Sequence, residues 1–421
     1  MQSPTGEPRD LTGTRMELEV GPVAHGGHCV ARWDGQVVFV RHTLPGERIV
    51  AEITEGREGD RFLRADAVEV LEAAPGRVEP RCPVARPGGC GGCDFQHASL
   101  ATQRELLGAV VSEQLSRLAG LEREVTVRPP LDDSAPDGLG WRTRVTFAAT
   151  DDGTLGLRRH RSHAIVPLDD CPIASRDLPD VLSLPWPAAR VTAVAGSDGD
   201  ALAAAYDVRG ELPPLEATGV LSDGRTVHGR GWVRETVSGR SFKVSGAGFW
   251  QVHPDAATTL VDAVMRAAAP KAGERVADLY AGAGLFSAFL GEAVGPEGAV
   301  ISVEGDAQAS RDARRNLSDL PQATLIHGDV SRALSLGHVG ERCDVVVLDP
   351  PRTGARAKVV RAIAALGPRT VVYVACDPAA LARDVRTFAE LGYTLGDLEA
   401  YALFPMTHHV ECVALLEPVG P

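Results

Sequence analysis

The sequence predicts an α/β protein that ends in a Rossmann-like, doubly wound sheet, preceded by a small β-barrel and a central α+β domain. Two observations support this fold class. Short apolar runs rich in β-branched residues alternate with helical patterns in the C-terminal part, and short alternating strands separated by Gly and Pro fill the N-terminal part. The expected boundaries are 9–72 for the barrel, 73–250 for the central domain and 251–421 for the doubly wound domain.

The overall composition is that of a soluble globular protein. The chain has 421 residues, of which 44% are hydrophobic and 24% are charged. No apolar run approaches the roughly 18 residues that span a bilayer, and the first residues lack the plan of a signal peptide. We therefore expect a cytoplasmic monomer without a membrane partner. The net charge of −13 argues against indiscriminate nucleic-acid binding, because it repels a phosphate backbone, but it leaves room for a local basic face.

The N-terminal part alternates apolar and polar residues over short stretches, with turn signals such as Gly26-Gly27 and Pro45-Gly46 between them. Strands are expected at residues 16–20, 36–40, 49–53 and 65–70. Strands at this spacing indicate a small barrel, and barrels of this size often bind oligonucleotides. A barrel that lacks aromatic side chains for base stacking can also be only a spacer.

Eight cysteines in a cytoplasmic chain of this length do not indicate a disulfide framework. Cys82, Cys90 and Cys93 crowd into a glycine-rich loop, and Cys171, which like Cys82 precedes a proline, is the best candidate for a fourth ligand. All-sulfur ligation suits zinc or an iron–sulfur cluster, and the uneven grouping favours iron–sulfur. Three cysteines in apolar, strand-like surroundings are expected to be small buried hydrophobic residues: Cys29, Cys343 and Cys412.

A helical pattern covers residues 99–119, and this helix is expected to pack on the doubly wound domain. Two strand-like stretches follow at 140–147 and 156–163, and here alone the local charge is clearly positive. These arginines either form a solvated strand face or grip RNA phosphates. They are Arg142, Arg144, Arg158, Arg159 and Arg161.

The stretch Val276–Phe286 reads as a strand, a tight loop with Gly282 and Gly284, and the start of a helix. Such a loop lets the backbone approach a nucleoside, and Glu304, at the end of the next strand, can accept hydrogen bonds from ribose hydroxyls. A dinucleotide fingerprint requires a third glycine where this chain has Ser287, and it places no acid at Asp278. The loop therefore favours S-adenosylmethionine over a dinucleotide.

Other polar residues fall at later strand ends, which is where ligands bind in a parallel sheet. Asp329 is placed to reach an adenine amino group, and Asp349 is followed by two prolines that fix its backbone. Gln251, just ahead of a helical run, either faces the cofactor cleft or forms a hydrogen bond at the helix entry.

Cys376 and Glu411 are the candidate catalytic residues. Cys376 follows an apolar strand and precedes Asp-Pro, so it can act as a nucleophile whose thiolate is favoured by the following helix N-terminus. The competing interpretation is a buried structural thiol. Glu411 opens an apolar strand, where desolvation can raise its pKa into the range of a general base.

Taken together, these residues resemble the RNA uracil carbon-5 methyltransferases, which form 5-methyluridine in transfer and ribosomal RNA. The barrel resembles a TRAM domain, and the four cysteines match the family's 4Fe-4S ligands. Three motifs match in order: Asp349-Pro-Pro-Arg352, Tyr373-Val-Ala-Cys376-Asp-Pro378 and Phe404-Pro-Met-Thr-His-His-Val-Glu411. The chain departs from the family's pattern in the longer gap between Cys82 and Cys90 and in Leu285, where relatives often have a polar residue.

The resemblance implies a specific reaction. The Cys376 thiolate adds to carbon 6 of the target uracil in RNA, carbon 5 takes the methyl group of S-adenosylmethionine, and Glu411 then removes the carbon-5 proton. The resemblance also implies contacts to the cofactor or base from Gln251, Tyr280, Gly282, Glu304, Asp329 and Asp349.

Two other functions fit parts of the sequence. An iron–sulfur oxidoreductase that uses a dinucleotide would explain the cysteines and the glycine loop, but it has no use for Asp278 or Cys376. A non-catalytic RNA-binding protein would explain the barrel and the arginines, but it leaves Asp349, Cys376 and Glu411 without a role.

Overall fold

The computed structural model describes residues 9–420, which form two compact units. Unit 1 contains the N-terminal residues up to 110 together with residues 158–166 and 405–408. Unit 2 contains residues 111–157, 167–404 and the C-terminal residues from 409. Two short segments that are remote in the sequence therefore belong to the N-terminal unit.

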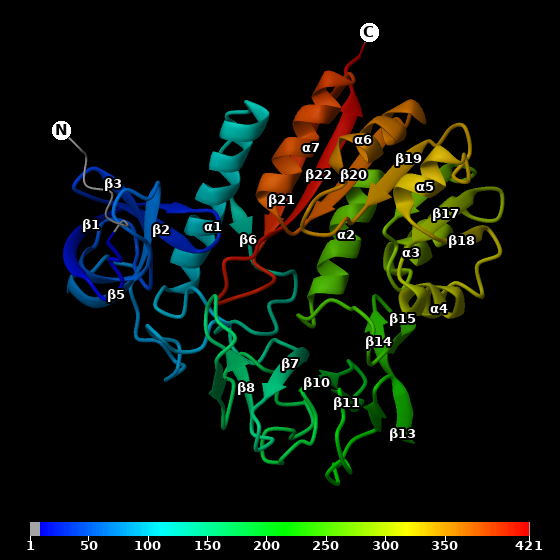
Figure 1. The fold of residues 1–421 in the computed structure, drawn as a ribbon. Helices are drawn as coiled ribbons and strands as arrows, with labels where there is room; N and C mark the ends of the chain where they lie inside the picture. Colours follow the sequence, from blue (N-terminus) through cyan, green and yellow to red (C-terminus); the bar gives the residue numbers. More distant parts are fainter. Residues whose placement is uncertain (1–8, 421) are drawn as a thin grey trace, which may run out of the picture. The chain divides into compact units, whose positions relative to one another are not determined.

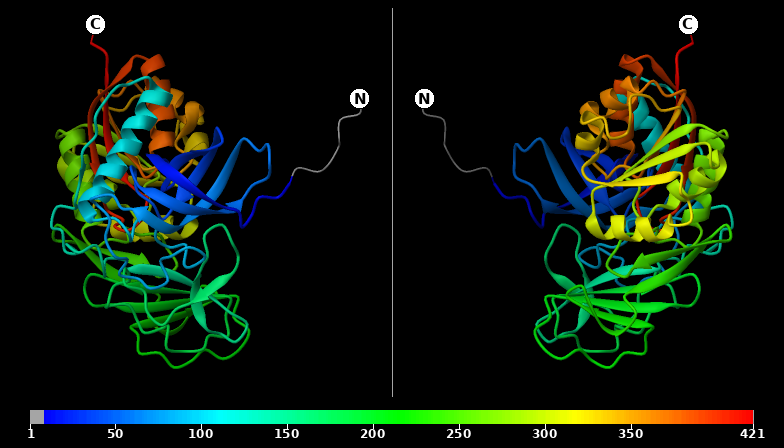
Figure 2. Two further views of the ribbon diagram at one scale, coloured as in Figure 1. Left: turned by 90° about the vertical axis from the view of Figure 1, so that its left-hand side faces the viewer. Right: turned by 90° about the vertical axis from the view of Figure 1, so that its right-hand side faces the viewer.

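A closed β-barrel forms most of unit 1 (blue in Figures 1 and 2), which confirms the predicted N-terminal barrel. Its strand order is β1-β2-β3-β5-β4, with β3 and β5 parallel and the other pairs antiparallel. The second strand was not predicted because its inward positions carry only the small side chains of Cys29 and Ala31. The strands are β1 (Arg15–Ala24), β2 (His28–Trp33), β3 (Gln36–Arg41), β4 (Arg48–Glu55) and β5 (Phe62–Glu72).

The predicted helix at 99–119 is confirmed as α1 (Leu100–Gln114), which continues as a π-helical turn, η1 (Leu115–Ala119). Ser99 Oγ accepts a hydrogen bond from the Thr102 backbone N–H at 3.2 Å and so caps the N-terminus. Gly120 ends the turn in the left-handed conformation, at φ 68°. In unit 2, η1 packs against α7 (Pro378–Glu390).

A sheet of seven strands has the order β13-β12-β11-β10-β7-β8-β9 (green in Figure 2); most of it belongs to unit 2, whereas Arg158 of β8 and residues 165–166 of β9 belong to unit 1. Unit 2 also contains a separate hairpin, β14-β15. No strand was predicted within residues 175–239. In β11, for example, three of the four buried residues are alanine, which has no preference for strands. The strands are β7 (Arg144–Ala149), β8 (Leu155–Arg158), β9 (Ile165–Pro167), β10 (Arg190–Ala195), β11 (Ala201–Tyr206), β12 (Gly219–Ser222), β13 (Arg225–Gly229), β14 (Trp232–Val237) and β15 (Arg240–Ser245).

The predicted doubly wound sheet is confirmed in unit 2, with the order β18-β17-β16-β19-β20-β22-β21-β6. Only β22 runs antiparallel to its neighbours. The strand order reverses between β16 and β19, and ligands bind at such a switch point. The strands are β16 (Arg275–Leu279), β17 (Ala299–Glu304), β18 (Ala323–His327), β19 (Val345–Leu348), β20 (Thr370–Ala375), β21 (Tyr393–Tyr401), β22 (Glu411–Pro418) and β6 (Val127–Arg128).

Helices cover both faces of this sheet (Figure 1). One face carries α2, α3 and α4, and the other carries α5, α6 and α7. Both faces of the central strands are therefore buried, and residues 345–348 of β19 are all fully buried. The remaining helices are α2 (Ala256–Ala268), α3 (Leu285–Val294), α4 (Ala307–Asn316), α5 (Val330–Ser335) and α6 (Arg356–Ala365). Over residues 9–420, no helix is long and apolar enough to cross a membrane.

Candidate active site

The loop after β16 has an unusual backbone. Tyr280, Gly282 and Gly284 all have positive φ, at 63°, 56° and 88°. A Cβ atom added at Gly282 would meet no atom within 4 Å, so the backbone of this residue faces open space. The Glu304 carboxylate braces the loop, because one oxygen accepts from Gly282 N at 2.8 Å and the other from Asp306 N at 2.6 Å. A ligand can therefore approach this backbone closely.

Asp278 lies fully buried at the end of β16. Its Oδ2 accepts a hydrogen bond from Ser287 Oγ at 2.5 Å, and Ser287 Oγ lies 2.6 Å from Ser302 Oγ. Its Oδ1 is buried and has no hydrogen-bond partner within residues 9–420. Burial raises the pKa of Asp278 to about 6. Ser287, which stands where a dinucleotide fingerprint has glycine, thus has a specific partner in Asp278.

Asp349 completes a group of three carboxylates at this edge of the sheet. Burial raises the pKa of Asp349 to about 7, and the negative charges of Asp278 and Glu304 raise it further. Such crowding costs free energy that a positively charged ligand offsets. S-adenosylmethionine carries a sulfonium and an ammonium group, whereas a dinucleotide brings phosphates. The donor set therefore fits S-adenosylmethionine.

The other predicted cofactor residues also lie in unit 2. Asp329 caps α5, because its Oδ1 accepts from Arg332 N at 2.8 Å. Burial raises the pKa of Tyr280 to about 12, and the charge of Asp329 contributes. Gln251 is buried, at 9% exposure, just before α2.

Cys376 follows β20 directly and is half-buried. The next residue, Asp377, caps α7 by accepting from Ala380 N at 2.7 Å. Burial raises the pKa of the Cys376 thiol to about 12, with contributions from the charges of Glu411 and Asp349, while Arg352 lowers it. The expected lowering by the helix N-terminus is thus outweighed by desolvation and by the neighbouring carboxylates.

Glu411 begins β22, which runs antiparallel to β20. The register pairs Ala375 with Cys412, so Cys376 and Glu411 occupy adjacent positions at one end of this strand pair. Glu411 is 4% exposed, and burial raises its pKa well above the ordinary value, with a further contribution from Asp349. The predicted effect of desolvation on Glu411 is therefore confirmed. Next to this pair, Arg352 Nη2 lies 3.1 Å from His409 Nε2.

The four predicted metal ligands are divided between the units. Cys82, Cys90 and Cys93 belong to unit 1, and Cys171 belongs to unit 2. Gly92 N donates to Cys90 Sγ at 3.4 Å, and Gln96 Nε2 donates to Cys93 Sγ at 3.6 Å. In the part of the chain that the structure describes, no group of three His, Cys, Asp or Glu side chains is arranged to hold a metal ion.

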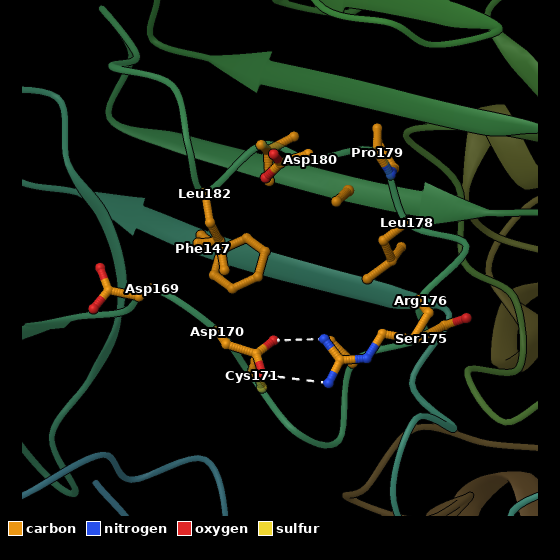
Figure 3. Close-up of a pocket in the computed structure, with 13 residues that line it drawn as sticks. Phe147, Asp169, Asp170, Cys171, Ser175, Arg176, Leu178, Pro179, Asp180 and Leu182 are labelled. Carbon is orange, nitrogen blue, oxygen red and sulfur yellow. Dashed lines mark hydrogen bonds and ion pairs between the residues drawn. The ribbon is translucent and has the colours of Figure 1, made fainter. Parts of the chain in front are cut away.

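Cys171 lines a pocket of about 390 Å³ in unit 2 (Figure 3). Phe147 lies in the wall of this pocket, together with the acidic residues Asp169 and Asp170. The two carboxylate oxygens of Asp170 accept hydrogen bonds from Arg176, at 2.9 and 3.3 Å. The loop that carries Cys171 is therefore held by an ion pair. The three thiols that were expected to be buried hydrophobic residues are indeed buried: Cys29, Cys343 and Cys412.

The five predicted RNA-binding arginines differ in exposure and are divided between the two units. Arg144 is buried, with its guanidinium donating to the carbonyl oxygen of Gly248 at 2.9 Å, so the expectation that it lies on an exposed face is wrong. Arg142 is half-buried, and its Nε donates to the Arg144 carbonyl oxygen. Both belong to unit 2. Three arginines are exposed in unit 1: Arg158, Arg159 and Arg161.

Arg159 and Arg161 line a groove of about 630 Å³ in unit 1, here called the barrel groove. The rest of its basic and aromatic lining was not predicted and comes from His160 and from five barrel residues: Arg15, His28, Phe39, Arg41 and Arg64. The carboxylates of Glu52, Glu55 and Asp66 also line it, and Glu55 lies 3.2 Å from Arg161 Nε. These arginines come from strands far apart in the sequence, so no local charge cluster indicated them.

The order of the doubly wound sheet, its antiparallel β22 and the carboxylate-lined glycine loop define an S-adenosylmethionine-dependent methyltransferase. The TRAM domain model matches residues 9–68, and the tRNA (Uracil-5-)-methyltransferase model matches residues 331–419. The chain belongs to the RNA (uracil-5-)-methyltransferase family. Relatives that are named RNA methyltransferases cover nearly its whole length.

Among these relatives, an uncharacterized RNA methyltransferase of Streptomyces coelicolor is 49% identical and covers 99% of this chain and 96% of its own. One of Bifidobacterium longum is 39% identical and covers 96% of this chain and 97% of its own. The solved structure of the Pyrococcus abyssi tRNA (uracil-54, C5)-methyltransferase with S-adenosyl-L-homocysteine covers 95% of this chain and all of its own, with a TM-score of 0.71 at 22% identity. The family prediction is confirmed, and the oxidoreductase and non-catalytic alternatives do not apply.

Proposed function

We propose that this enzyme methylates carbon 5 of one specific uridine in ribosomal or transfer RNA, through a covalent adduct between Cys376 and the uracil. The observation that carries the proposal is the register of β20 and β22. It brings a thiol and a buried carboxylate to adjacent positions, and Asp349 of the cofactor edge contributes to the pKa of both.

The chemistry requires these residue types, because carbon 5 of an unmodified uracil is a poor nucleophile. The Cys376 sulfur forms a bond to carbon 6, and the displaced electron pair makes carbon 5 nucleophilic. S-adenosylmethionine supplies the methyl group when it is bound. Glu411 takes the proton from carbon 5, and the electron pair released re-forms the double bond and expels the Cys376 thiolate. Burial suits Glu411 to this role, since its raised pKa makes the carboxylate a stronger base.

Two further sets of residues support binding in this proposal. The carboxylates and the glycine loop would hold the cofactor: Asp349 would attract its positive groups, and Glu304 would accept hydrogen bonds from its ribose hydroxyls. The proposed cofactor residues are Gln251, Tyr280, Gly282, Glu304, Asp329 and Asp349. RNA phosphates are bound by three exposed arginines and one half-buried arginine, with Arg144 left out because its guanidinium is buried. These are Arg142, Arg158, Arg159 and Arg161.

The experiment that tests the function combines purified protein and labelled S-adenosylmethionine with separate transfer and ribosomal RNA fractions. Label should appear in 5-methyluridine of one fraction after digestion to nucleosides. Label in a different nucleoside would contradict the proposed target atom.

Replacing Arg159 and Arg161 by Ala should weaken RNA binding and reduce its dependence on salt. Each lost phosphate contact with a single strand lowers the slope of log K against log salt by about 0.7, so the double variant should lose about 1.4. Fluorescence anisotropy with labelled RNA at several salt concentrations measures both quantities. Arg386→Ala is the matched control, because Arg386 is also exposed and pairs with a glutamate, Glu390. Equal slopes for the double variant and the control would show that Arg159 and Arg161 do not bind RNA phosphates and are ordinary solvated surface residues.

We also propose that Cys82, Cys90, Cys93 and Cys171 bind a 4Fe-4S cluster. The hydrogen bonds from Gly92 N and Gln96 Nε2 support this, because such donors stabilise thiolate sulfur. Protein purified without oxygen should be brown and contain about four iron and four sulfide per chain. Cys90→Ser should lower the iron content, whereas Cys29→Ser, at a buried thiol of the barrel, should leave it unchanged. One equivalent of zinc and no iron would disprove the cluster.

A further inference from the structure

Residues 405–408 belong to unit 1, although both of their neighbours in the chain, Phe404 and His409, belong to unit 2. This four-residue segment connects β21 to β22, and Glu411 begins β22 three residues after His408. The way in which this segment is held in unit 1 therefore affects the position of Glu411, the proposed general base.

Backbone hydrogen bonds hold the middle of the segment. The carbonyl oxygen of Met406 accepts from Asp94 N at 2.8 Å and from Phe95 N at 2.9 Å. Met406 itself is 6% exposed and has a φ of 67°, a backbone conformation that residues other than glycine rarely adopt. A strained backbone of this kind persists only where its surroundings determine it.

The Gln103 side chain, from α1, provides part of these surroundings. Its Oε1 accepts from Met406 N at 2.8 Å. Its Nε2 donates to the carbonyl oxygens of Phe95 at 3.1 Å and Ala98 at 2.9 Å. Gln103 is 3% exposed, so these bonds are protected from water. One buried amide thus joins α1, the loop after the cysteines and residue 406.

Asp94 holds the end of the segment. Its Oδ2 accepts from His408 N at 3.1 Å and lies 2.6 Å from His408 Nδ1, while its Oδ1 lies 3.5 Å from Arg41 Nη2. The turn between β1 and β2 closes over this pair, since a Cβ atom at Gly27 would come within 2.7 Å of His408 Cβ and 3.0 Å of Asp94 Cβ. Asp94 is 8% exposed, so it is the buried centre of this arrangement.

We propose that Asp94 and Gln103 are positioning residues for Glu411, an inference that rests on the proposed function. By fixing Met406 and His408, they set the direction in which the chain enters β22. Without the side chain of Asp94 or Gln103, residues 405–410 would be more mobile, and the Glu411 carboxylate would occupy a wider range of positions. A displacement of about 1 Å can cost about 100-fold in rate. Cys376 follows a different strand, β20, so addition to the uracil should be affected less than removal of the carbon-5 proton.

The test measures how much enzyme is trapped on RNA. Asp94→Ala and Gln103→Ala should each lower kcat by about tenfold to 100-fold and leave the KM for RNA within about twofold. In both variants, a covalent protein–RNA species should accumulate and survive denaturing electrophoresis, because elimination is slowed more than addition. Asp94→Asn keeps the side-chain volume and one oxygen acceptor, so it should fold and trap an intermediate fraction of enzyme.

Glu47→Ala is the matched control. Glu47 is also a buried carboxylate of unit 1, and it binds Arg77 at 2.5 Å and Leu44 N at 2.8 Å. Its removal should lower the thermal stability without trapping RNA. If Glu411→Gln traps RNA while the Asp94 and Gln103 variants lose activity without trapping it, the positioning role is wrong and the proposed function stands. If Glu411→Gln traps nothing, the proposed role of Glu411 as the base for elimination is wrong, and this inference fails with it.

Discussion

Cys376→Ala should bind RNA and S-adenosylmethionine normally, transfer no methyl group and form no covalent species with RNA. Without the sulfur no bond to carbon 6 can form, so methylation should fall by more than about 1,000-fold. The measurements are methyl incorporation from labelled S-adenosylmethionine, and electrophoresis of the enzyme with RNA under denaturing conditions. Cys343→Ala is the matched control, because Cys343 is a buried thiol at the other end of the parallel strands, just before β19.

The rate of adduct formation by the wild-type enzyme should also depend on pH. Burial and the nearby carboxylates raise the pKa of Cys376 to about 12, so the thiolate is a minor species at neutral pH. Below this pKa the thiolate fraction rises about tenfold for each pH unit, and single-turnover adduct formation should rise with it. Substantial methylation by Cys376→Ala would contradict the covalent mechanism.

Glu411→Gln should fail at a later step than Cys376→Ala. Addition and methyl transfer remain available, but no carboxylate accepts the carbon-5 proton, so turnover should fall by about 10²–10⁴-fold. The enzyme should accumulate as a covalent complex with methylated RNA, visible as a slowly migrating band on a denaturing gel.

RNA with 5-fluorouridine at the target position is an independent check on the same step. Fluorine cannot leave carbon 5 as a cation, so the wild-type enzyme should be trapped in the same way as Glu411→Gln. Glu399→Gln is the matched control, because Glu399 is a poorly exposed carboxylate of the neighbouring strand β21 that pairs with Arg266 at 2.8 Å. The absence of a covalent species with both the Glu411 variant and the fluorinated RNA would disprove the covalent mechanism.

The strands of the doubly wound sheet could be predicted because their residues are buried on both faces and therefore form continuous apolar runs. The strand expected at the start of Val276–Phe286 is β16, and the apolar strand expected before Cys376 is β20. β21 was missed because a bulge between Leu395 and Leu398 interrupts its alternation. The pattern of apolar residues along the chain therefore predicts a strand only where no bulge interrupts that pattern.

The sequence could predict which residues form the candidate site, but it could not predict how they are arranged in space. The motifs identified Cys376 and Glu411, yet their adjacency depends on the pairing of β20 with β22, which no local pattern encodes. The alternation of residues 140–147 likewise assigned Arg144 to one face of a strand, but it could not show that Ser245, at the end of β15, and Gly248 cover its guanidinium. Asp94 was missed for the same reason, because its partner His408 is 314 residues away in the chain.

The composition of unit 1 from three separate stretches has a consequence for synthesis on the ribosome. The barrel strands are complete once residue 72 has emerged, and they can pair early, since N-terminal domains generally fold first. Residues 405–408, by contrast, leave the ribosome long after the barrel strands. Until then Gln103 Oε1 cannot accept its hydrogen bond from Met406 N, and the Asp94 carboxylate lacks its partner His408. A chain that stops before residue 405 should therefore contain a folded barrel beside a loop whose buried polar groups lack their native partners.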